Sequence, residues 1–67
     1  MDLRIKNQRY KGFYVWNSKN LVEVGKNGTS IHTYFEKKDY ASREVLKMDI
    51  YRYIDEMQKF INVEEFT

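Results

Sequence analysis

The stretch from Asp39 to Ile61 constrains the fold most, because apolar residues recur along it at spacings of three and four. This period predicts one long helix with a core-facing stripe of Leu46, Ile50, Tyr53, Met57 and Phe60, flanked by Ile54 and Ile61. The chain contains no Pro, and no Gly follows residue 28, so nothing interrupts the helix. Asp39 is the expected N-cap, and Ser42 is the alternative one turn later. The residues before the helix should form a small sheet that packs on it.

Two large side chains fall on the opposite side of this helix, where they should be partly exposed. Met48 and Tyr51 share that side with charged residues. Single exposed apolar residues are common on protein surfaces, which is the simpler interpretation. The alternative is a second partner contact on the back of the helix.

The length of 67 residues predicts one small domain, with residues 62–67 as a C-terminal tail. A domain this short is marginally stable by itself, and with no Cys it has no disulfide to reinforce it. Six Tyr, four Phe and one Trp are the expected compensation, because large rings bury much area. The N-terminus lacks the apolar run of a signal peptide, and no stretch is long and apolar enough to span a bilayer. A soluble, cytoplasmic protein without membrane contact is therefore expected.

Three strands are predicted before the helix. Aromatic and β-branched residues dominate the segments at 10–16, 21–25 and 29–35. A polar turn at 17–20 separates the first two, and Asn27-Gly28 is a strong hairpin signal between the last two. Residues 1–8 alternate weakly, as in a short fourth edge strand or a flexible arm. The predicted fold class is α+β, a three-stranded antiparallel meander packed on one long C-terminal helix, with the N-terminal strand as a possible fourth.

The two turns predict a register. A two-residue turn at Asn27-Gly28 sets Val24 opposite Ile31, and a four-residue loop at 17–20 sets Trp16 opposite Leu21. The first face of the sheet then carries Phe13, Val15, Val22, Val24, Ile31, Thr33 and Phe35. The second carries Tyr14, Trp16, Leu21, Glu23, His32 and Tyr34, with Tyr10 beyond them. The aliphatic first face should pack on the helix.

One helix covers one face, so the aromatic second face needs another explanation. The N-terminal arm could fold over it through Leu3 and Ile5. Otherwise it binds a protein, as a homodimer or with a different partner, because exposed apolar clusters usually mark interaction sites. Nucleic acid is the third possibility, with bases stacked on the rings. The predicted partner-binding residues are Tyr10, Tyr14, Trp16, His32 and Tyr34.

The residues of the known catalytic and cofactor-binding motifs are missing. The three Gly lack the spacing of a phosphate loop, and one His and no Cys leave no recognisable metal site. Glu23 and His32 form a cross-strand polar pair more simply than part of a catalytic triad. No enzyme activity, cofactor or metal is expected.

The charge pattern favours a protein partner over nucleic acid. Some DNA-binding domains of integrases and plant transcription factors read DNA with a three-stranded sheet backed by a helix, but such a face should carry Arg and Lys. Here the basic residues lie at the margins, and a basic rim would consist of Arg4, Lys6, Arg9, Lys11, Lys19 and Lys26. The chain is also rich in Lys, Asn, Ile, Tyr and Glu, which AT-rich genes favour. Small proteins of phages and mobile elements often share this composition, and many of them inhibit a host protein. The predicted function is a small protein-binding module, such as an inhibitor or regulator of a host protein.

Overall fold

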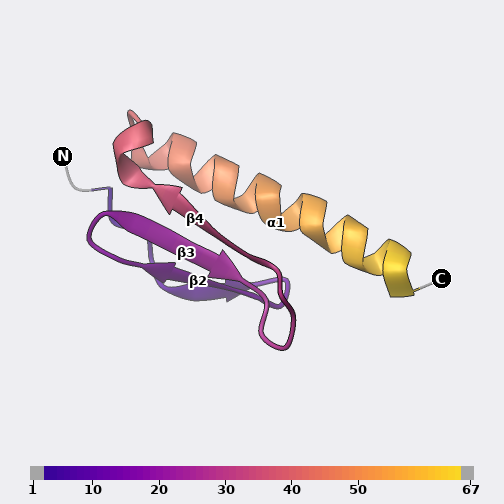
Figure 1. Ribbon diagram of the computed structural model, residues 1–67. Coiled ribbons are helices and arrows are strands. Elements are labelled where there is room, and N and C mark those ends of the chain that lie inside the picture. The colour runs from indigo at the N-terminus through magenta and orange to yellow at the C-terminus, as the bar shows by residue number, and fades with distance from the viewer. Residues whose placement is uncertain (1–2, 66–67) are drawn as a thin grey trace.

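The computed structural model describes residues 3–65 and the side chains of residues 3–61. Its elements are strands β1 (Gln8–Tyr10), β2 (Phe13–Asn17), β3 (Leu21–Gly25) and β4 (His32–Glu36), a short 3-10 helix η1 (Lys37–Asp39) and helix α1 (Arg43–Glu65). The strands form one antiparallel sheet in the order β1-β2-β3-β4, and α1 lies along one face of it (Figure 1). The α+β fold class is confirmed. A fourth, N-terminal strand is present, but it spans residues 8–10 rather than lying within the predicted 1–8.

A tight turn interrupts the first predicted strand, 10–16, after its first residue: Tyr10 ends β1, and β2 begins at Phe13. Lys11 and Gly12 both have positive φ, 51° and 84°, as two-residue hairpin turns require. Tyr10 therefore pairs with Phe13 across the β1–β2 hairpin. Paired residues share a face of the sheet, whereas residues three apart on one continuous strand do not. The prediction that Tyr10 belongs to the second face is wrong for this reason.

The predicted register is displaced by two residues in both other hairpins. Val15 lies opposite Val24 rather than Val22, and Val22 lies opposite Phe35 rather than Thr33. The face assignments of β2, β3 and β4 survive, because side chains alternate and a displacement of two keeps each residue on its face.

The turn lengths explain the displacement. The Lys26 N–H donates to the Ile31 carbonyl at 3.1 Å, so the β3–β4 connection spans four residues, 27–30, instead of two. The Ser18 N–H donates to the Leu21 carbonyl at 2.9 Å, so the β2–β3 turn tightens to Lys19 and Asn20. The Asn-Gly pair does lie in a turn, with Gly28 at a φ of 81°, but in a longer one than predicted.

The core lies between α1 and the inner face of the sheet, which is the face towards the helix. Its buried residues are Leu3, Ile5, Phe13, Val15, Val22, Val24, Leu46, Ile50 and Ile54. The fully buried residues of the helix are Leu46, Ile50 and Ile54. Ile54 therefore belongs to the core-facing stripe itself and not to the flank of that stripe, where it was predicted. Tyr53 and Met57 are partly buried beside these residues.

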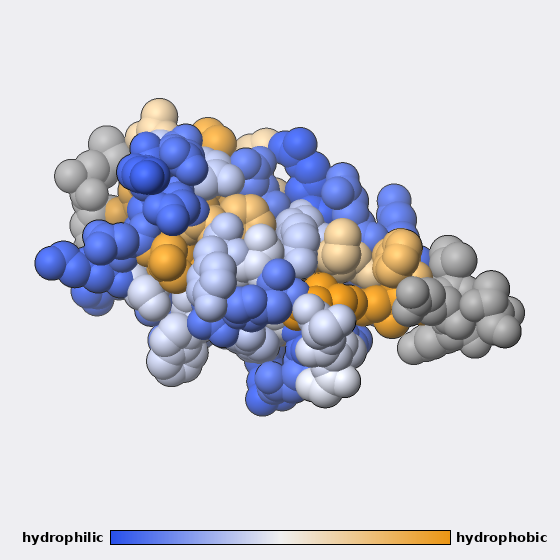
Figure 2. Space-filling model, viewed as in Figure 1, coloured by the Kyte–Doolittle hydropathy of each residue, from blue (hydrophilic) through white to orange (hydrophobic). Residues whose placement is uncertain are grey.

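The C-terminal part of α1 extends past the end of the sheet (Figure 1). Apolar side chains remain uncovered along this part, next to the undescribed residues (Figure 2). Phe60 is 59% exposed there, although periodicity predicted it in the core stripe. The periodicity is helical throughout, but none of the four strands β1 to β4 reaches far enough to cover the last turns of α1. The helix also continues to Glu65 beyond the predicted end at Ile61, and residues 66–67 of the predicted tail lie outside the described residues.

The N-terminal arm packs on the inner side of the sheet and leaves the second face open. Leu3 is 7% exposed and Ile5 is 3% exposed, and both belong to the core. The alternate residues of the arm, Arg4 and Lys6, are exposed. The Ile5 N–H donates to Asn17 Oδ1 at 3.1 Å, which ties the arm to the end of β2. The possibility that this arm covers the aromatic face is therefore wrong.

The N-cap of α1 is Ser42, the alternative named above. Ser42 Oγ accepts from the Val45 N–H at 3.3 Å, while Asp39 ends η1 four residues before the helix begins. The Tyr40 hydroxyl bridges this junction by donating to Asp49 Oδ2 at 2.9 Å. Burial and this hydrogen bond raise the pKa of Tyr40 to about 12.

Candidate functional site

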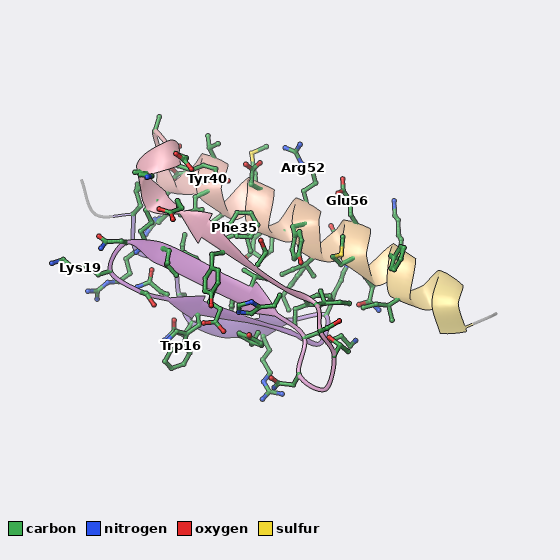
Figure 3. The ribbon with its side chains drawn as sticks, in the orientation of Figure 1. Trp16, Lys19, Phe35, Tyr40, Arg52 and Glu56 are labelled. Atoms are coloured by element: carbon green, nitrogen blue, oxygen red, sulfur yellow. The ribbon has the colours of Figure 1, made fainter. Side chains whose placement is uncertain are left out.

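The site lies on the outer face of the sheet, the face turned away from α1. Strand pairing arranges it in two rows, Trp16–Glu23–Tyr34 and Tyr14–Gly25–His32. Four of the five predicted partner-binding residues are thus neighbours on one surface. Trp16 points away from the helix on the far side of the sheet (Figure 3).

Two large rings stand in solvent on this face. Trp16 is 55% exposed and Tyr34 is 54% exposed, and each is the direct cross-strand neighbour of Glu23. Adjacent strands lie about 4.8 Å apart, which places the backbones of Trp16 and Tyr34 roughly 10 Å apart across the carboxylate. Two rings on either side of one carboxylate are the central feature of the face.

Glu23 organises the polar groups between the rings. Its Oε2 accepts from the Tyr14 hydroxyl at 2.7 Å and lies 3.1 Å from Nε2 of His32. These contacts, that of Tyr14 first, hold the pKa of Glu23 below its ordinary value, and the same hydrogen bond raises the pKa of Tyr14. The His32 ring meets Tyr34 edge to face at 4.6 Å between centroids. The carboxylate is therefore held in its ionised form and in one orientation.

Gly25 makes room for this arrangement. A Cβ atom there would lie 2.8 Å from the Tyr14 hydroxyl and 3.0 Å from the Ile31 carbonyl oxygen. The absence of a side chain lets the Tyr14 ring lie across β3 and reach Glu23. Sequence alternation had placed Glu23 on the face but had not identified it as the centre, and Gly25 offered no signal.

Tyr10, the fifth predicted residue, is not part of the face. Its ring contacts Tyr51 on α1 at 4.7 Å, and its hydroxyl donates to Asp55 Oδ1 at 3.4 Å. Tyr51 also accepts from Gln8 Nε2 at 2.9 Å, so its ring joins α1 to β1. Met48 is 61% exposed and Tyr51 is partly buried, and their role as a second partner contact stays a prediction.

The predicted basic rim is dispersed. Lys11 Nζ pairs with Asp55 Oδ1 at 2.8 Å, which raises the pKa of Lys11 and lowers that of Asp55. Lys26 lies over the inward-facing Phe13 ring at 5.5 Å. Arg4 and Lys6 are in the arm and Lys19 is in the β2–β3 turn. Of these six, Arg9 alone occupies a strand position on the outer face, opposite Tyr14.

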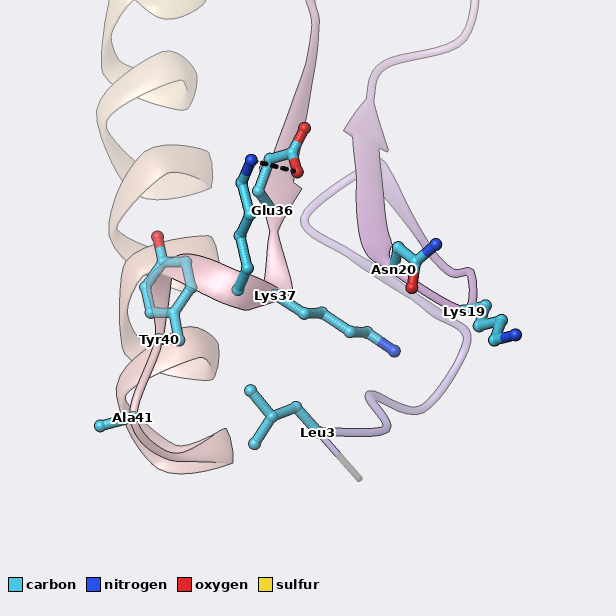
Figure 4. A pocket seen from close by; sticks show the side chains of 8 residues that line it. Leu3, Lys19, Asn20, Glu36, Lys37, Tyr40 and Ala41 are labelled. Atoms are coloured by element: carbon cyan, nitrogen blue, oxygen red, sulfur yellow. Dashed lines mark ion pairs between the residues drawn. The ribbon is translucent and has the colours of Figure 1, made fainter. Parts of the chain in front are cut away.

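A hollow at the other end of the sheet was not foreseen from the sequence (Figure 4). It is lined by Leu3, Lys19, Asn20, Glu36, Lys37, Lys38, Tyr40 and Ala41. Lys37 Nζ donates to the Ser18 carbonyl at 2.7 Å, and Lys38 pairs with Glu36 at 4.0 Å. Two of the three Lys side chains that line the hollow therefore have a partner within the chain, but only Lys38 is paired with a negative charge.

Comparisons of the chain with protein-family models, curated proteins and solved structures found no match. Within residues 3–61, no three or more His, Cys, Asp or Glu side chains are grouped so that they could hold a metal ion. No helix in the described part of the chain is long and apolar enough to cross a membrane. The function must therefore be inferred from the outer face itself.

We expect Tyr14→Phe to raise the pKa of Glu23 towards 4.5, because it removes the hydrogen bond that lowers this pKa most. His32→Ala should raise it less. A carboxyl whose pKa is lowered by folding adds stability above its unfolded pKa and loses it as the pH falls through the folded pKa. The wild type should therefore lose more stability than Tyr14→Phe on acidification below about pH 4.5.

A carbon-detected NMR titration of the Glu23 carboxyl measures this pKa. Tyr34→Phe is the matched control, since it removes a hydroxyl from the same face that does not bond Glu23. An unchanged Glu23 pKa in Tyr14→Phe would show that the Tyr14 hydroxyl does not hold the carboxylate.

Proposed function

We propose that this chain is a non-enzymatic protein-binding module that recognises its partner through the outer face of the sheet. The supporting observation is that the side chains of Trp16 and Tyr34 are more than half exposed. They lie on either side of the Glu23 carboxylate, which a hydrogen bond from Tyr14 holds in place. No other part of the described chain covers this face, because the arm and the helix both pack on the inner side. Trp and Tyr dominate the residues that contribute most to protein–protein affinity.

The charges of the face support a protein partner over nucleic acid. Glu23 lies at the centre with a lowered pKa, so a phosphate brought to the rings would meet a negative charge. Glu36 adds a second carboxylate on the same face, opposite Leu21. Nucleic-acid readers instead gather cations where the backbone must approach.

The polar groups of the face are engaged with one another, which supports a binding role over catalysis. His32 is directed to Glu23 at 3.1 Å, and the hydroxyl of Tyr14 donates to the same oxygen. Ser42, one of the serines considered for a triad, caps α1. A stoichiometric inhibitor or regulator of a host protein is the class of binder that residue usage suggests.

The first test is to capture partners from source-cell lysate with the wild type and with two double variants. Trp16→Ala with Tyr34→Ala removes the rings of the face. Val45→Ala with Met48→Ala is the matched control, since both are exposed apolar residues on α1. A captured protein should then be purified, and its affinity measured by calorimetry. We expect the face variant to bind at least about 100-fold more weakly and the helix variant to bind like the wild type.

Analytical ultracentrifugation over a range of protein concentrations tests whether the partner is a second copy of this chain. A dimer that dissociates in the face variant would place the homodimer contact on this face. Equal binding of a partner by the wild type and the face variant would refute the proposal. Binding of nucleic acid that weakens steeply with salt and survives in the helix variant would favour that alternative instead.

A further inference from the structure

A shallow hollow on the outer face has a lining suited to a cation. It is formed by Tyr14, Trp16, Glu23 and Asn27. Two of these residues present aromatic rings, one a carboxylate and one a side-chain amide. None is basic, in contrast to the hollow at the opposite end of the sheet, which three Lys line.

The carboxylate in this hollow has capacity for another donor. Both of its contacts with the described residues, from Tyr14 and His32, fall on Oε2. Oε1 accepts no hydrogen bond from the described part of the chain. The side chain is 33% exposed, so a donor from outside can reach it.

The shape of the lining favours a planar cation. A cation placed over the face of Trp is attracted by the ring, and Trp is the strongest of the aromatic residues in this respect. A guanidinium stacks flat on such a ring while its N–H groups donate in the plane to a carboxylate, whereas an ammonium is compact and more strongly hydrated. One group can therefore satisfy both the ring and Oε1.

We propose that this hollow binds an arginine side chain of the protein partner, with the guanidinium stacked on Trp16 and donating to Oε1 of Glu23. This inference rests on the proposed function, because it identifies what the partner presents to the face. Arg9 is the cation nearest in the strand pairing, opposite Tyr14, but it does not line the hollow.

The test uses the short peptide acetyl-Gly-Arg-Gly-amide and the full chain. Trp16 is the only Trp, so its fluorescence and its indole N–H resonance both report on the hollow. The matched peptide carries citrulline, which keeps the shape of arginine without its charge. We expect saturable binding of the arginine peptide with a Kd on the order of 1–10 mM, and binding of the citrulline peptide at least about tenfold weaker.

Two variants that change the net charge by the same amount test whether the arginine peptide binds at Glu23. Glu23→Gln should weaken binding of the arginine peptide about tenfold or more. Glu36→Gln removes a carboxylate from the same face away from the hollow, and it should change the affinity less than about twofold. Thermal melts of both variants check that they fold.

Three outcomes would each overturn this inference. They are equal binding of the arginine and citrulline peptides, tighter binding of a lysine peptide, and an unchanged affinity of the Glu23→Gln variant for the arginine peptide. The peptide comparison uses the wild type, so it does not depend on how the variants fold. If the arginine peptide fails while partner capture still depends on Trp16 and Tyr34, the arginine site is refuted alone. If capture is independent of these rings, the proposed function is refuted.

Discussion

The largest loss of stability is expected from Phe13→Ala. Phe13 is fully buried in the core, and truncating a buried Phe costs about 3–5 kcal/mol. A chain of 67 residues has a total stability of about 3–10 kcal/mol. The substitution therefore removes a large part of the free energy of unfolding, or all of it. Urea titration followed by far-UV circular dichroism measures the loss.

Trp16→Ala is the control for this prediction, because it removes a larger ring from the same strand on the opposite face. Trp16 is 55% exposed, so its truncation should change stability by no more than about 0.5 kcal/mol. A loss comparable to that of Phe13→Ala would mean that Trp16 belongs to a core and that the candidate site is wrongly assigned. A Phe13→Ala variant as stable as the wild type would mean that the inner face is not the core.

Ile5→Ala has the second largest expected effect, a loss of about 2–5 kcal/mol in the free energy of unfolding. Ile5 precedes the first strand, yet it is only 3% exposed and packs in the core with residues of the sheet and of α1. Truncation leaves a cavity that the backbone cannot easily close, because the Ile5 N–H is hydrogen-bonded to Asn17. Urea denaturation of the full-length variant measures the effect.

Lys6→Ala is the matched control one residue along. Lys6 is exposed, and its truncation should alter stability by about 0.5 kcal/mol or less. Equal, small effects of both substitutions would show that the arm is not part of the folded core. The outer face would then have to be reconsidered, because a free arm could reach it.

Two periodicities in the sequence were sufficient to predict the fold class and most of the candidate site. The period of the C-terminal stretch predicted the helix, and the alternation in β2, β3 and β4 separated Phe13 and Val15 from Tyr14 and Trp16. This separation is robust because one face is aliphatic and must be buried. The register errors were both of two residues, which leaves every side chain on its predicted face.

The position of the N-terminal residues depended on tertiary packing. Eight residues with weak alternation do not indicate which side of a sheet they pack on, and Leu3 and Ile5 suit either face. Tyr10 changed face because Lys11 adopts a positive φ, which is uncommon for Lys and which no local pattern indicated. Phe60 is exposed because the sheet ends before the helix does, a matter of relative length that periodicity does not report.

The centre of the site also depended on tertiary structure. Alternation identifies the residues that share a face, but the register decides which of them are neighbours. The predicted pairing placed Glu23 opposite His32, whereas the observed pairing places it between Trp16 and Tyr34. The carboxylate between two exposed rings therefore follows from the lengths of the turns. The alternation of residue types was enough to predict the aromatic face, whereas the pairing of the strands set which of its side chains are neighbours.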